Sequence, residues 1–189
     1  MTKASSMRYI SILRGINVGG HKKIKMADLK ALYIKLGLNS VTTYIQSGNL
    51  IFESNKTDIS QLIQAIEDGI LKQYGFEVPV MIRTADAWEE IIQNYPFGVN
   101  SLENLTTVLV TLLSTKPTEA SFKTLMEHVK SPDLLVLHED YIYLHTPNGY
   151  GKTKLSNNFI EKTLNVKATT RNWKSVMKLH ELSKVANDV

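Results

Sequence analysis

Residues 41–54, VTTYIQSGNLIFES, are the stretch that decides the fold. Two runs rich in β-branched and aromatic residues, 41–46 and 50–54, flank the turn sequence SGN at 47–49. Runs of this kind on either side of a glycine-containing turn predict a β-hairpin. The segments around this hairpin then determine how the first half of the chain is organised.

A helical segment lies on each side of the hairpin. Residues 26–37 and 57–75 both place apolar side chains at helical spacing, and each segment ends on a glycine. Strand-like runs at 8–14 and 77–83 enclose these elements, and Pro79 in the second run favours a sheet edge. The resulting order is strand, helix, strand, strand, helix, strand, which is the ferredoxin-like βαββαβ unit.

The same order recurs in the second half of the chain. The expected strands are 106–114, 134–140, 141–146 and 166–171, and the expected helices are 118–130 and 155–165. A further helix follows each unit, at 85–95 and at 172–186. The sequence therefore predicts an α+β fold of two ferredoxin-like βαββαβ units in tandem, each followed by an extra helix. The expected domains are an N-terminal extension at 1–6, a first unit at 7–97 and a second unit at 98–189.

The composition is that of a globular protein of the cytoplasm. Apolar residues make up 43% of the 189 residues and charged residues 21%. No apolar run is long enough to span a bilayer, and no secretory leader opens the sequence, so we expect no membrane partner. Cysteine is absent, which excludes disulfides and thiolate chemistry and fits a reducing compartment. The oligomeric state stays open, and a monomer fits the composition.

Charge is distributed unevenly along the chain, although the net charge is only +4. Residues 1–35 hold eight basic residues (Lys or Arg) and one acidic residue. Residues 36–147 hold six basic and fourteen acidic residues, and residues 148–189 hold eight basic and three acidic residues. Basic ends around an acidic middle favour a polarised surface with a face for anions. The alternative is that these lysines are ordinary solvated surface residues.

The loop RGINVGGHKKIK at 14–25 is the first candidate site. Ferredoxin-like topology places the end of the first strand beside the turn between the second and third strands, so Arg14 and Asn17 should lie beside Gln46 and Asn49. Backbone N–H groups freed by glycines, together with lysines, can hold an anion. The alternative is that the glycines only shape a long connection, because the loop does not match GxGxxG.

The segments HTPNGYGKTKLS (145–156) and TTRNW (169–173) form the second candidate site, because both follow strands that end at the same sheet edge. A nucleotide-hydrolysing P-loop would need glycine at Thr146, so only weak anion binding is expected there. Arg171 can pair with phosphate while Trp173 stacks on a base. The alternative is that Asn172 caps the last helix and Trp173 is buried beneath it.

The two edges together define the set of candidate anion-binding residues. They are Arg14, Asn17, Gly19, Gly20, Lys22, Lys23, Lys25, Ser47, Asn49, Lys152, Lys154, Arg171, Asn172 and Trp173. The five histidines are scattered without metal-ligand spacing, and no GxSxG motif is present. We therefore expect no metal, no cofactor and no catalytic group. The only aromatic residues of the central strands are Tyr9 and Phe52, so these strands lack the aromatic pattern of RNA-recognition domains.

Two long motifs carry a family resemblance. The stretch ILRGINVGGHKKIKMADLKALYIKLGLNSVTTYIQSGNLIFES and the stretch ATTRNWKSVMKL resemble the opening and closing signatures of a bacterial family catalogued as domain-of-unknown-function family 1697. The resemblance spans residues 8–182 and implies a two-lobed fold of paired ferredoxin-like units. It implies no activity. The signature positions are Arg14, Gly15, Asn17, Gly19, Gly20, Met26, Gln46, Ser47, Gly48, Asn49, Thr170, Arg171, Asn172 and Trp173.

Non-catalytic binding of a phosphorylated partner is the function that the basic, glycine-bearing loops favour. Nucleic acid is preferred over a free nucleotide as that partner, and lysines would contact its phosphates. One alternative is an enzyme that acts on a small phosphorylated or carboxylated substrate between the lobes, with Arg14, Asn49 and Arg171 orienting the anion. Another is a structural adaptor, for which an exposed apolar patch would be the sign.

Overall fold

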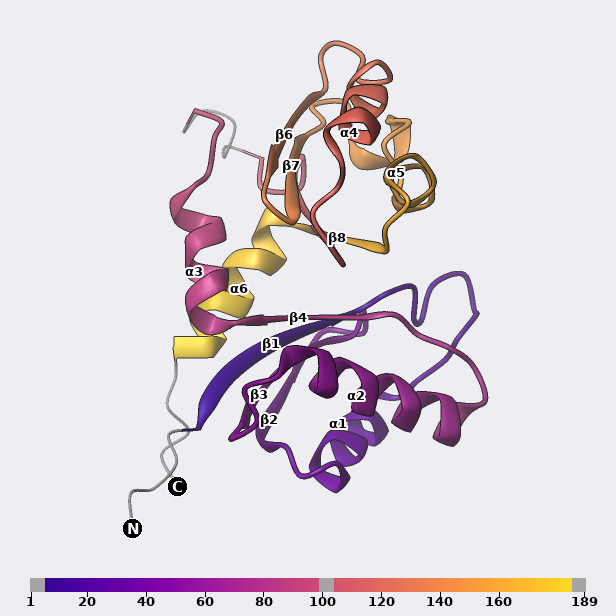
Figure 1. Ribbon diagram of the computed structural model, residues 1–189, viewed down its shortest axis with the longest axis vertical. Helices are drawn as coiled ribbons and strands as arrows, with labels where there is room; N and C mark the ends of the chain where they lie inside the picture. The colour runs from indigo at the N-terminus through magenta and orange to yellow at the C-terminus, as the bar shows by residue number, and fades with distance from the viewer. Residues whose placement is uncertain (1–5, 99–103, 185–189) are drawn as a thin grey trace. The chain divides into compact units, whose positions relative to one another are not determined.

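The computed structural model of the chain describes residues 6–98 and 104–184. These residues divide into two compact units (Figure 1). The first unit contains residues 6–92 and 179–184, and the second contains residues 93–98 and 104–178. The first unit therefore includes the end of the last helix as well as the N-terminal half of the chain.

The first unit has the predicted ferredoxin-like order. Its elements are β1 (Met7–Leu13), α1 (Met26–Lys35), β2 (Asn39–Tyr44), β3 (Asn49–Ser54), α2 (Ile59–Tyr74), β4 (Val80–Thr84) and α3 (Ala85–Gln93). The four strands form one antiparallel sheet in the order β2-β3-β1-β4, and α1 and α2 cover one face of it (Figure 1). The Asp58 carboxylate caps α2 by accepting the N–H groups of Ser60 and Gln61.

The second unit repeats this arrangement. Its elements are β5 (Val108–Leu113), α4 (Glu119–Met126), β6 (Leu134–His138), β7 (Tyr141–His145), the short 3₁₀ helix η2 (Tyr150–Lys152), α5 (Asn157–Leu164), β8 (Ala168–Asn172) and the first part of α6 (Trp173–Lys184), whose residues from Leu179 onward belong to the first unit. The sheet order is β6-β7-β5-β8, again with antiparallel neighbours. The prediction of two tandem ferredoxin-like units, each followed by a helix, is confirmed.

Helix α4 is shorter than the sequence pattern predicts. The apolar spacing extends over 118–130, but α4 ends at Met126 and the chain continues as an irregular connection to β6. Pro132 follows shortly after, and the residue before a proline is disfavoured in helical conformation. The released residues become one wall of a pocket that is described below.

Aromatic side chains fill the core between the first sheet and its helices. Tyr9 stacks on Phe52 with ring centroids 5.5 Å apart, and Tyr33 of α1 meets Phe52 edge-on at 5.6 Å. All three side chains are fully buried. Tyr9 and Phe52 therefore pack against helices and cannot stack on bases in the manner of an RNA-recognition domain.

An ion pair crosses the first sheet between neighbouring strands. Arg8 and Glu53 lie opposite each other in the β1–β3 register, and Arg8 Nε donates to Glu53 Oε1 at 3.2 Å with a second bond from Nη2. Ser40 Oγ donates to the other carboxylate oxygen at 3.0 Å, and Arg8 Nη1 donates to the carbonyl of Ser183 at 2.8 Å. The hydrogen bonds from Arg8, with a smaller contribution from Ser40, lower the pKa of Glu53.

Gly48 is required by close packing at the hairpin turn. Its φ is 76°, and a Cβ there would lie 2.7 Å from Leu13 Cβ and 2.8 Å from Ile16 Cδ1. The N–H of Leu13 donates to the Gly48 carbonyl at 2.8 Å, so the turn lies directly against the end of β1. No side chain fits between these two backbone segments.

The Glu53 ion pair should make stability depend on pH. Since the pKa of Glu53 is lower in the folded chain, its stabilisation is present above the unfolded-state pKa of about 4.3 and is lost as pH falls through the folded-state value. Glu53→Gln should lower the free energy of unfolding by about 1 kcal/mol at neutral pH and by progressively less in acid. Urea unfolding at a series of pH values measures this. Glu139→Gln is the control: Lys116 also lowers the pKa of Glu139, but this pair is exposed, so the substitution should change the free energy of unfolding far less. A pH-independent effect of Glu53→Gln would contradict the assignment.

Replacing Gly48 should destabilise the chain more than replacing an unconstrained glycine. Gly48→Ala should lower the free energy of unfolding by about 2–4 kcal/mol, combining the left-handed backbone cost with overpacking against Leu13 and Ile16. Gly20 has a φ of 79° but open space for a Cβ, so Gly20→Ala should cost only about 1–2 kcal/mol. Urea denaturation of both variants makes the comparison, and equal losses would refute the packing argument.

Candidate anion-binding sites

Asn17 closes the glycine–lysine loop, residues 14–25, and attaches it to the hairpin turn. Its Nδ2 donates to the carbonyls of Ile24 at 2.9 Å and Gln46 at 2.8 Å, and its Oδ1 accepts the N–H of Ile24 at 2.9 Å. The loop therefore lies beside the β2–β3 turn, as the topology predicts. Because both amide hydrogens of Asn17 are engaged, this side chain positions the loop and has no N–H left for an anion.

The tip of the glycine–lysine loop is exposed. Gly19 and Gly20 have φ values of 57° and 79°, and the side chains of Lys23 and Lys25 face solvent. Lys22 is half-buried, and its Nζ donates to the carbonyl of Glu77 at 2.6 Å. Lys23 and Lys25 are thus the loop lysines that are most accessible to a ligand, while Lys22 holds the loop against the segment before β4.

Asn49, Ser47 and Arg14 lie nearer the protein interior. Asn49 is fully buried, and its Nδ2 donates to the Tyr44 carbonyl at 3.1 Å and to Ser47 Oγ at 2.8 Å. Asn49 therefore shapes the hairpin turn, and its side chain does not reach the surface where an anion would bind. Arg14 is half-buried, with its backbone N–H bonded to the Pro79 carbonyl at 2.9 Å.

The closing motif of the second unit is mainly structural. Asn172 Oδ1 accepts the N–H of Ser175 at 2.9 Å and so caps the start of α6. Trp173 is only 4% exposed, and its ring lies 4.6 Å from that of Tyr95. Base stacking by Trp173 is therefore excluded in this conformation, because the ring is already covered. Arg171 Nη1 donates to Thr169 Oγ1 at 3.1 Å and to the Thr170 carbonyl at 2.9 Å.

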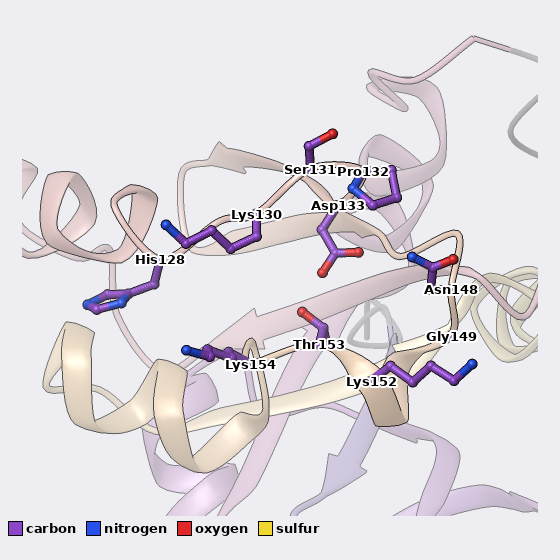
Figure 2. A pocket seen from close by; sticks show the side chains of 10 residues that line it. All are labelled: His128, Lys130, Ser131, Pro132, Asp133, Asn148, Gly149, Lys152, Thr153 and Lys154. Carbon is purple, nitrogen blue, oxygen red and sulfur yellow. The ribbon is translucent and has the colours of Figure 1, made fainter.

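A pocket of about 460 Å³ lies within the second unit (Figure 2). One wall is the connection between α4 and β6, and the other is the segment between β7 and α5. We call it the lysine pocket; it is lined by His128, Lys130, Ser131, Pro132, Asp133, Asn148, Gly149, Lys152, Thr153 and Lys154. Of the residues predicted from sequence, it contains Lys152 and Lys154, whereas Arg171, Asn172 and Trp173 do not line it.

Sequence reasoning missed the first wall of the lysine pocket. His128 and Lys130 fall within the range predicted as helix, and Asp133 follows that range. The signal that could have found them is the β6–β7 hairpin, in which Leu134 pairs with His145. Since antiparallel partners stand opposite each other, the segment before β6 and the segment after β7 must meet at one edge.

The charged groups of the lysine pocket are arranged in zones. In Figure 2 the amino groups of Lys130 and Lys154 extend from opposite walls toward the side on which His128 lies, and Lys152 points the other way, toward the side of Asn148. The Asp133 carboxylate lies between these two sides. Among the residues that the structure describes, neither Asp133 nor any of these three lysines forms a salt bridge. The lining thus carries three ammonium groups against one carboxylate.

Within residues 6–98 and 104–184, no helix combines the length and apolar character needed to cross a bilayer. The same ranges hold no group of three or more His, Asp or Glu side chains placed to bind a metal ion.

Comparison with known proteins identifies a family. The chain is similar to the solved structure of the conserved bacterial protein SP0830 from Streptococcus pneumoniae, with 25% sequence identity, a TM-score of 0.75 and coverage of 95% of this chain and 100% of that chain. No curated protein matches the chain. A family model described as "Protein of unknown function (DUF1697)" matches residues 7–143, which is more than half of the chain. The chain therefore belongs to the DUF1697 family of proteins of unknown function.

Proposed function

We propose that this chain is a non-catalytic, cytoplasmic binding protein for a phosphorylated partner, with nucleic acid preferred over a free nucleotide. The observation that supports this most is the lysine pocket. Lys130, Lys152 and Lys154 line it together with a single carboxylate, and none of the three is engaged in a salt bridge among the described residues. Ammonium groups without a protein counter-ion favour phosphate oxygens as hydrogen-bond acceptors.

The glycine–lysine loop supports the preference for a partner with several phosphates. Lys23 and Lys25 are exposed there, next to the exposed backbone of Gly19 and Gly20. Each unit of the chain thus has its own accessible basic segment. A polymer carries many phosphates and can release counter-ions at more than one such segment, whereas a free nucleotide is limited to one.

Binding to oligonucleotides should be detectable and should weaken with salt. Fluorescence anisotropy with labelled, 5′-phosphorylated single- and double-stranded oligonucleotides, at low and near-physiological salt, should show a logarithm of affinity that falls linearly with the logarithm of salt concentration. The double variant Lys130→Ala/Lys154→Ala should lower affinity by about tenfold and reduce the salt slope by about 1–2. Lys23→Ala/Lys25→Ala should lower affinity to a comparable extent, and unchanged affinity would show that the loop takes no part in binding.

Lys123→Ala is the matched control, because Lys123 is an exposed lysine on α4 that does not line the lysine pocket. It should leave both affinity and salt slope nearly unchanged. Loss of binding in the control would indicate general charge attraction in place of a site. Absence of oligonucleotide binding even at low salt would exclude nucleic acid, and absence of binding to phosphorylated small molecules as well would exclude the proposed function.

A further inference from the structure

We propose that the lysine pocket selects a terminal phosphomonoester on a hydroxylated sugar, with phosphate held between Lys130 and Lys154 and a sugar hydroxyl held by Asp133. This inference rests on the proposed function and narrows its ligand. The chemistry is that of a pentose phosphate, either as a free sugar phosphate or at the phosphorylated end of an oligonucleotide. An internal phosphodiester should fit the pocket less well than a terminal phosphomonoester, so an oligonucleotide would place its phosphorylated end there.

The phosphate end of the pocket is defined by side chains from both walls. Lys130 and Lys154 extend toward the same side, where His128 also lies (Figure 2). The N–H of Asp133 donates to the Lys130 carbonyl at 2.9 Å, which fixes the turn that carries Lys130. Two ammonium groups that extend from separate segments toward the same side of the pocket suit a group with several negatively charged oxygens, as a phosphomonoester has.

The middle of the pocket has the opposite character. The Asp133 carboxylate and the Thr153 hydroxyl point toward one another there, from opposite walls (Figure 2). An ionised carboxylate is only an acceptor, so it repels a phosphate and binds an O–H donor. Thr153 Oγ accepts the N–H of Leu155 at 3.2 Å, which leaves the hydroxyl proton to donate to a ligand oxygen. A sugar hydroxyl, which both donates and accepts, satisfies both groups.

The position of Asp133 allows the pocket to discriminate between a ligand with a single phosphate and a strand with several consecutive phosphates. A nucleic acid strand passing through the pocket would bring a second phosphate next to this carboxylate, where like charges repel. A pocket of about 460 Å³ falls within the usual size of small-ligand sites. Asn148 and Lys152 at the other side can contact the remainder of the sugar or a substituent on it.

Isothermal titration calorimetry with inorganic phosphate, ribose and ribose 5-phosphate tests this ligand class. The wild-type chain should bind ribose 5-phosphate about tenfold more tightly than inorganic phosphate, since the hydroxyl contact adds roughly one hydrogen bond. Asp133→Asn should abolish most of that preference and should bind inorganic phosphate as well as or better than wild type. Lys130→Ala/Lys154→Ala should weaken both phosphate-containing probes, and Lys123→Ala should change neither.

The arms of the experiment separate the possible failures. If Asp133→Asn retains or increases the preference for ribose 5-phosphate, the hydroxyl assignment is overturned while phosphate binding stands. If wild type binds no phosphate-containing probe, the proposed function falls with it. An oligonucleotide with a 5′-phosphate, compared with the same strand lacking it, distinguishes the two sources of the phosphomonoester. Tighter binding of the phosphorylated strand supports the end of a nucleic acid as the ligand. Equal binding of both strands, with ribose 5-phosphate still bound, supports a free sugar phosphate. Thermal melts of all variants verify that they are folded.

Discussion

The antiparallel pairing of each unit's first strand with the second strand of its hairpin is the constraint on which the rest of the structure depends. β1 pairs with β3 and β5 pairs with β7, and the registers of these pairs determine which loops become neighbours. Ile12 stands opposite Asn49, so the end of β1 meets the hairpin turn of the first unit. Val108 stands opposite His145, so the segment after β7 leaves the sheet at the start of β5. The strand pairing therefore determines where the glycine–lysine loop and the basic segment after β7 lie in each unit.

Much of the fold could be predicted because periodicity and turn chemistry agree along the chain. The hairpin at 41–54, the capped helix after it and the edge strand that begins directly after Pro79 each carry a local signal, and all of them fit one topology. Topology alone also placed the glycine–lysine loop beside the turn at Gln46. The end of α4 could not be read from apolar spacing, because the spacing continues to residue 130 while the helix ends at Met126, and Pro132 restricts only the residue directly before it.

The candidate site was harder to predict, because a sequence shows which polar residues are present and not which are already engaged. Asn17 and Asn49 lie in the glycine-rich motifs, yet their side-chain N–H groups already donate hydrogen bonds to backbone carbonyls and to Ser47 Oγ. Trp173 was a candidate for stacking, but Tyr95 covers it. Conversely, Lys130 and Asp133 belong to no recognisable sequence motif. They are candidate ligand contacts because the β6–β7 hairpin places their segment opposite the one that carries Lys154.

The last helix gives the chain an unusual route. α6 begins in the second unit, and from Leu179 onward its residues belong to the first, where the carbonyl of Ser183 accepts a hydrogen bond from Arg8 at the opposite end of the sequence. During synthesis the first unit consequently emerges without one of its own parts. Because residues of the first unit stand on both sides of the second unit in the sequence, two cuts of the chain would be needed to separate the units as complete pieces.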